Sequence, residues 1–226
     1  SNANISGIKS TPAIFLMQAA RMADYLGDTD EMLKLTNQLF KRKDLSSQLL
    51  IQLASLYARH EKNVKLGQLI AQLPNGFDKL KIRKVLSHQT PSPKIAHHIA
   101  AGIIDLSLIA NQLKNNNMLN GRLGLALYLN PKSERARFLI AQELSEINQK
   151  QSAKEHLAAI DHNGLWSQPR LLLEINLDRS DNIGLAISHL QNFLAKNQKN
   201  AFLQKELGDL YRVSDQLDKA RDAYLM

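Results

Sequence analysis

Small side chains recur through the downstream part of this sequence with a period of 33 to 34 residues. Two landmarks carry this period, one early in each repeat and one late. The first landmark is at Ala141, Glu174 and Gly208, and the second is at Ala153, Ala186 and Ala220. Glu174 alone departs from the small-residue rule. Two landmarks with one shared period indicate a tandem repeat, and a repeat of this length accommodates one pair of short helices.

Gly208 lies between Leu207 and Asp209 in a segment that is otherwise rich in helix formers. A glycine inside a helix costs about 1 kcal/mol relative to alanine, so a compensating contact is expected. Close packing of a neighbouring helix is the usual compensation. We therefore predict a structural packing role for the small residues Ala141, Ala153, Ala186, Gly208 and Ala220.

Nearly the whole sequence has the pattern of helices. Apolar residues recur at three- and four-residue spacing, and no sustained alternation of period two is present. Thr11-Pro12, Ser92-Pro93 and the segment Ser167 to Pro169 each combine a capping hydroxyl with a proline in the first turn. The sequence therefore predicts an all-α protein.

The last repeat resembles the tetratricopeptide repeat, a helix–turn–helix unit of about 34 residues. Leu207, Gly208, Tyr211, Ala220 and Tyr224 stand where that family places leucine, glycine, tyrosine, alanine and an aromatic residue. The resemblance implies an α-α superhelix, or solenoid, of stacked helical hairpins. The family's first-helix tryptophan is absent throughout.

The resemblance weakens upstream, so we expect an irregular N-terminal part. Residues 4–90 are predicted to hold degenerate helical-hairpin repeats and one extra helix between residues 78 and 89. Residues 91–226 are predicted to hold tetratricopeptide-like units in the same continuous solenoid, at about 100–133, 134–166, 167–200 and a truncated 201–226. The downstream half, roughly residues 95–226, contains AAGIIDLSLIA, LALYLNP, LWSQPRLLLEINLDR and ELGDLYR in that order. In these motifs it is also similar to a family of bacterial repeat proteins, which implies a bacterial source and no particular chemistry.

The family resemblance implies a concave groove lined by the first helix of each unit, where a protein or peptide is bound. The positions carried over are a mixture of apolar side chains and both charges. They are Phe138, Gln142, Leu171, Ile175, Asp178, Arg179, Lys205, Asp209 and Arg212. The Lys-and-Asn set with which some family members hold a C-terminal carboxylate is absent.

The sequence offers no convincing catalytic constellation. It has no cysteine, and it lacks phosphate-binding loops, dinucleotide fingerprints and zinc-protease motifs. His97 and His98 point about 100° apart on a helix and therefore do not converge on one metal ion. No run approaches the length of a membrane span. We expect a non-enzymatic protein without metal or cofactor.

The favoured function is a binding scaffold for a protein or peptide of unknown identity. The net charge of +8 keeps a nucleic-acid-binding solenoid open as an alternative. A structural role is a third interpretation, with self-association through the C-terminal end around Tyr224. The leading Ser1-Asn2-Ala3 resembles a remnant of tag cleavage, so an export signal could have been removed with the native N-terminus. The compartment is therefore left as bacterial cytoplasm or periplasm.

Overall fold

The computed structural model describes residues 12–60, 62–74, 77–87, 94–112, 119–196 and 200–225. Within these residues the chain forms thirteen α-helices and no strand. It divides into two compact units, one of residues 1–73 and 82–116 and the other of residues 74–81 and 117–226. The all-α helical-repeat fold predicted from the sequence is confirmed.

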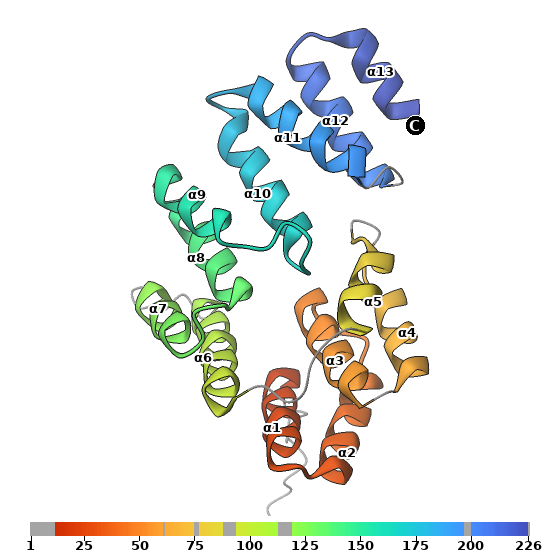
Figure 1. The fold of residues 1–226 in the computed structure, drawn as a ribbon, viewed down its shortest axis with the longest axis vertical. Coiled ribbons are helices and arrows are strands. Elements are labelled where there is room, and N and C mark those ends of the chain that lie inside the picture. Colours follow the sequence, from red (N-terminus) through yellow and green to blue (C-terminus); the bar gives the residue numbers. More distant parts are fainter. Residues whose placement is uncertain are drawn as a thin grey trace, which may run out of the picture. The chain divides into compact units, whose positions relative to one another are not determined.

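The first unit is built on two helical hairpins, α1 with α2 and α3 with α4, and α6 packs against α1 (Figure 1). Its core centres on fully buried side chains such as Met17, Met32 and Tyr57. The second half of α5 also belongs to this unit. The helix bounds are α1 (Ala13–Leu26), α2 (Thr29–Phe40), α3 (Ser47–Arg59), α4 (Asn63–Ala71), α5 (Lys79–Ser87) and α6 (Ile95–Gln112).

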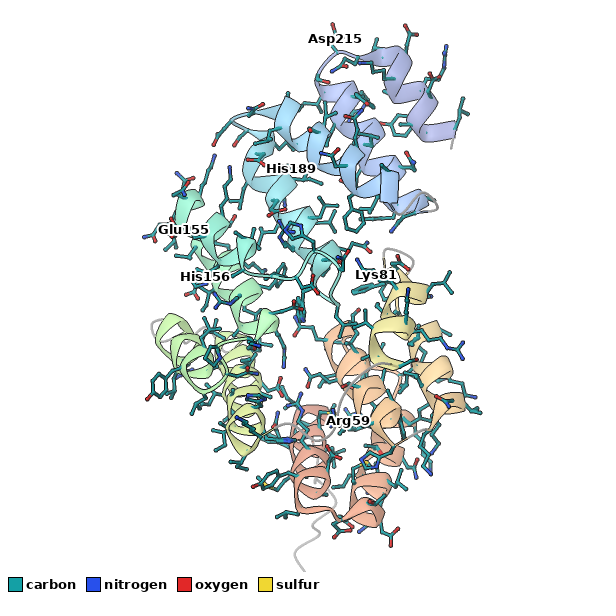
Figure 2. The ribbon with its side chains drawn as sticks, viewed as in Figure 1. Arg59, Lys81, Glu155, His156, His189 and Asp215 are labelled. Carbon is teal, nitrogen blue, oxygen red and sulfur yellow. The ribbon has the colours of Figure 1, made fainter. Side chains whose placement is uncertain are left out.

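A buried carboxylate ties α1 to the end of α3. Asp24 accepts a hydrogen bond from Arg59 at 2.5 Å, and its other oxygen lies 2.6 Å from Nε2 of His60. Burial acts to raise the pKa of Asp24, but the hydrogen bonds from His60 and Arg59 outweigh it and hold that pKa below its usual range. Asp24 is therefore an ionised group inside the first unit (Arg59 is labelled in Figure 2).

The second unit stacks three hairpins, α8 with α9, α10 with α11 and α12 with α13 (Figure 1). Helix α10 contacts both helices of the preceding hairpin, and α11 contacts α12, so the hairpins share apolar cores. Helix α7 packs against α8. The helix bounds are α7 (Leu119–Leu129), α8 (Glu134–Glu146), α9 (Lys150–Ala158), α10 (Ser167–Arg179), α11 (Ile183–Lys196), α12 (Ala201–Val213) and α13 (Leu217–Leu225).

Local sequence determines where these hairpins begin and turn. The side chains of Ser133 and Asn200 accept hydrogen bonds from backbone N–H groups in the first turns of α8 and α12. Asn148 and Asp215, both five residues before the small residue of the following helix, have φ of 60° and 59°. Asparagine and aspartate tolerate this left-handed conformation better than most residues. The same turn is thus repeated two periods apart.

The five predicted small-residue positions are all buried in the second unit. Ala141, Ala153 and Ala186 have no exposed surface. A Cβ added at Gly208 would lie 2.6 Å from Cδ1 and 2.8 Å from Cζ of Tyr224. The aromatic ring of α13 therefore occupies the space that a side chain at position 208 would need.

The predicted domain limits stay predictions. Helix α5 lies within the segment where an extra helix was expected. Residues 88–93, which hold the expected boundary, are outside the described part of the chain. The expected unit at 100–133 would pair α6 with α7, which belong to different compact units, and residues 113–118 between them are also outside the described part.

Candidate binding surface

One face of α12 carries a mixed apolar and charged stripe that the core does not bury. Its members follow the helical spacing i, i+3, i+7, i+10, i+11. They are Phe202, Lys205, Asp209, Arg212 and Val213. Phe202 and Val213 remain 38% and 54% exposed. We call these five residues the α12 face.

Charges alternate along the α12 face. Lys205 donates to Asp209 at 2.9 Å, and Arg212 lies 3.9 Å from the same carboxylate. The Tyr224 hydroxyl donates to Asp209 at 2.8 Å. The hydrogen bonds from Lys205 and then from Tyr224 lower the pKa of Asp209. The face therefore presents a fixed carboxylate between two exposed cations.

Helix α8 contributes less to a continuous groove than the resemblance implies. Phe138 is half-buried, and its ring centroid lies 5.2 Å from that of Trp166. Gln142, one turn further along, is exposed. Trp166 packs against the core shared by α8, α9 and α10 and is not a free stacking platform.

Helix α10 buries most of its predicted groove residues. Leu171 and Ile175 are each 5% exposed and belong to the core shared with α11, α12 and α13. Asp178 is 2% exposed and pairs with Lys154 of α9 at 2.5 Å. Nδ1 of His189 in α11 lies 3.5 Å from its other oxygen (Figure 2). Of the four α10 positions, Arg179 alone is exposed.

The helix that buries these residues is also the one that departs from the small-residue rule, at Glu174. Arg170 donates to Glu174 at 2.6 Å and to the carbonyl oxygen of Leu157 in α9 at 2.9 Å, and it also contacts His162. This polar network occupies the place where α8 and α12 have Ala141 and Gly208. In α10, Leu171 and Ile175 lie in the core. The sequence signal was the glutamate in the repeat register, four residues after Arg170.

A segment from outside the repeats holds the N-terminus of α10. Lys81 donates to the Ser167 hydroxyl at 2.8 Å and lies over the Phe193 ring at 5.4 Å (Figure 2). The backbone N–H of Asp78 donates to Gln168 at 3.2 Å. Burial lowers the pKa of Lys81. The sequence pattern does not predict this contact between residues 86 apart.

No metal site or membrane span is found among the described residues. None of their His, Asp and Glu side chains form a cluster of three suited to an ion. His98 is buried, with its ring 5.5 Å from that of Tyr25, whereas His97 is half-buried. Within the described ranges, no helix has both the length and the apolar character needed to cross a bilayer.

Comparison with known proteins gives no family assignment. No protein-family model matches the sequence, and no curated protein matches it. One similar solved structure is described as a human IFIT1 dimer with PPP-AAAA, at 14% identity and a TM-score of 0.24. The match covers 94% of this chain and 53% of that chain, so the present chain spans about half the length of the solved one.

Proposed function

We propose that the chain is a non-enzymatic scaffold of the tetratricopeptide type, which binds a protein or peptide across the α12 face. The observation that carries this proposal is the stripe itself. Two apolar side chains bracket a cation–anion–cation series, and the opposite side of the same helix is packed into the core. A stripe of this composition suits a folded or extended protein segment better than a uniformly anionic polymer.

The two kinds of residue have different tasks. Phe202 and Val213 supply apolar contact area, and burial of apolar surface is the main favourable contribution to most protein–protein association. Lys205 and Arg212 select ligands with acidic or carbonyl groups at matching positions, since exposed ion pairs contribute more to specificity than to affinity. Asp209, fixed by Tyr224, disfavours ligands that carry negative charge throughout.

The extent of the surface follows from the burial of α10. Gln142 and Arg179 are exposed and can extend the contact, and half-buried Phe138 offers part of its ring. Leu171, Ile175 and Asp178 act in the core and are left out of the proposal. The ligand surface is therefore centred on α12 rather than spread evenly along three units.

The test is quantitative affinity capture from a lysate of the source cells, in about 0.5 M salt and after nuclease treatment. It compares the native chain with the double variant Lys205→Glu/Arg212→Glu. A matched control is Lys62→Glu/Lys132→Glu, which changes the net charge equally at exposed sites off α12. We expect the native chain and the control to retain the same defined proteins. The α12 variant should retain at least tenfold less of them.

Two outcomes would overturn the proposal. Retention that is the same for the α12 variant and the control would remove the α12 face from binding. Retention that disappears with salt or nuclease would instead favour nucleic acid, because counterion release makes such binding steeply salt-dependent.

A further inference from the structure

Arg21 of α1 and Asp105 of α6 face each other, and the exposed side chains described on these two helices are apolar. Arg21 donates to Asp105 at 2.9 Å, and Gln18 also donates to that carboxylate. Asp105 has no exposed surface, and Arg21 is 9% exposed. The second charged residue of α1, Asp24, is buried as well. The charged side chains of this helix pair are therefore buried and hydrogen-bonded inside the first unit.

The exposed positions of the two helices are almost purely apolar. On α1 and on residues 95–108 of α6, no exposed position carries a charge, although charged residues make up 22% of the chain. We call the following set the α1–α6 face. Its members are Phe15, Ala19, Met22 and Leu26 of α1 and Ile95, Ile99 and Leu106 of α6.

The two stripes open to the same side. Gln18 meets Asp105 and Tyr25 meets His98, so the helices run antiparallel. Successive residues of a helix are rotated by about 100° around its axis. By this count, the apolar stripe of each helix lies about 75–95° around the axis from the residues that contact the other helix, and the rotation has the same sense in both helices. In an antiparallel pair this turns both stripes toward one side. The register aligns Phe15 with Leu106, Met22 with Ile99 and Leu26 with Ile95.

The middle of the α1–α6 face is low, because Ala19 and Gly102 are small. Gly102 adjoins Gln18, whose side-chain oxygen is 3.4 Å from where a Cβ would stand. Small residues at the centre of the face let the apolar stripe of a third helix approach closely.

The second unit shows what covers such a face. Aligning Ala19-Ala20 with Leu207-Gly208 places Phe15, Ala19 and Met22 at the positions of Leu203, Leu207 and Leu210. Those three leucines are at most 8% exposed, because they share a core with α11. The α11 residues Ile183, Ile187, Leu190 and Leu194 recur at i, i+4, i+7 and i+11, the spacing of the α1 stripe.

The charge and the size of the α1–α6 face further limit which class of partner can bind there. An anionic membrane is disfavoured, because membrane-surface helices carry Lys and Arg beside their apolar stripe and α1 exposes neither. The face measures roughly 20 by 20 Å, or about 400 Å², from the helix rise and spacing. A standard interface buries about 800 Å² on each partner, so the area fits a helix better than a second folded copy.

We propose that the α1–α6 face docks an amphipathic helix of a protein partner, whose apolar residues recur at i, i+4, i+7 and i+11. The docked helix packs on α1 and α6 as α11 packs on α12. This site is separate from the α12 face, and neither proposal depends on the other.

The probe is a hydrocarbon-stapled, fluorescein-labelled peptide with the sequence of residues 183–196, which carries the α11 stripe. Fluorescence anisotropy would be measured with the full chain, and a peptide of the same composition with the stripe scrambled is the specificity control. We expect saturable binding of the first peptide only. Met22→Glu and Ile99→Glu should each weaken it at least tenfold, and Val64→Glu, a substitution at an exposed apolar site on α4, should change it less than twofold.

Several results would overturn the proposal. One is absence of binding, and another is equal binding by Met22→Glu and the native chain. A dimer seen by sedimentation velocity and abolished by Met22→Glu would assign the face to a second copy, and loss of vesicle co-sedimentation in that variant would assign it to lipid. Thermal melts check folding, and Leu26→Glu, at a position 70% exposed, replaces any variant that melts early.

Discussion

The contacts of Gly208 show directly why this position is a glycine. The ring of Tyr224 fills the space beside its Cα, and the Tyr224 hydroxyl reaches past it to Asp209. The helix accepts the entropic cost of glycine because a larger residue would displace this ring. The sequence predicted a close approach here, but not that a single aromatic side chain makes it.

At this residue we predict that Gly208→Ala lowers the free energy of unfolding by about 1 kcal/mol, since overpacking outweighs the gain in helix propensity. Urea denaturation measures the change. Gly121→Ala on α7, where a Cβ meets nothing within 4 Å, should instead raise it by about 0.5–1 kcal/mol. In a Tyr224→Ala background, Gly208→Ala should no longer be destabilising, and a penalty that persists in this double-mutant cycle would contradict the packing explanation.

Single residues also mark the limit of sequence reasoning about the candidate site. Lys205, Asp209 and Arg212 lie where the repeat register suggests, because α12 follows the family pattern closely. Leu171 and Ile175 occupy the same register positions in α10 and are buried. The register assigns positions to a helix, but the rotation of that helix depends on tertiary contacts such as Arg170 to Leu157.

At the scale of elements, the helices whose termini the sequence defines well are those with capping side chains. Asn200 caps α12, whereas Gln149, at the corresponding position before α9, forms no capping hydrogen bond. The existence of most helices could be predicted from apolar periodicity. The packing of α6 on α1 could not, because it depends on a buried ion pair between residues 84 apart.

This difference in caps predicts two opposite effects. Gln149→Asp should raise the free energy of unfolding by about 0.5–1 kcal/mol, because a carboxylate there accepts from the free N–H groups of α9 and suits the helix dipole. Asn200→Ala should lower it by about 1 kcal/mol. Chemical denaturation of both variants against the native chain gives the values. A loss of stability in Gln149→Asp would show that the α9 turn cannot adopt the capped geometry.

At the scale of the whole molecule, two compact units with separate cores predict different responses to acid. Asp24 has a lowered pKa in the folded first unit, so its stabilisation is present above pH about 4 and is lost as the pH falls through the folded pKa. Burial raises the pKa of Glu134 and Glu143 in the second unit. Those groups bind protons more tightly when folded, which favours folding as the pH falls. Asp181 and Asp209 of the same unit have lowered pKa values, but they lie near the surface, where solvent screens their contribution to stability.

We therefore predict that the first unit loses stability before the second between pH 4 and 2. Trp166, the sole tryptophan, lies in the second unit and reports its unfolding by fluorescence, while circular dichroism reports both units. The dichroism transition should begin at higher pH than the fluorescence transition. Asp24→Asn should destabilise the first unit already at neutral pH and remove the difference in pH dependence. Coincident transitions in the native chain would mean that the units unfold together.

The contact of Lys81 with Ser167 has a consequence for synthesis and folding. Repeat arrays generally start folding at any hairpin, since each one needs only its neighbours. Lys81 instead meets a partner 86 residues downstream. Closing so long a loop costs chain entropy, and this cost precedes the stabilisation that the contact provides. At ribosomal rates of about 5–20 residues per second, Ser167 is synthesised about 4 to 17 s after Lys81. The segment around Lys81, which includes exposed Leu80, therefore lacks its folded partner during that interval.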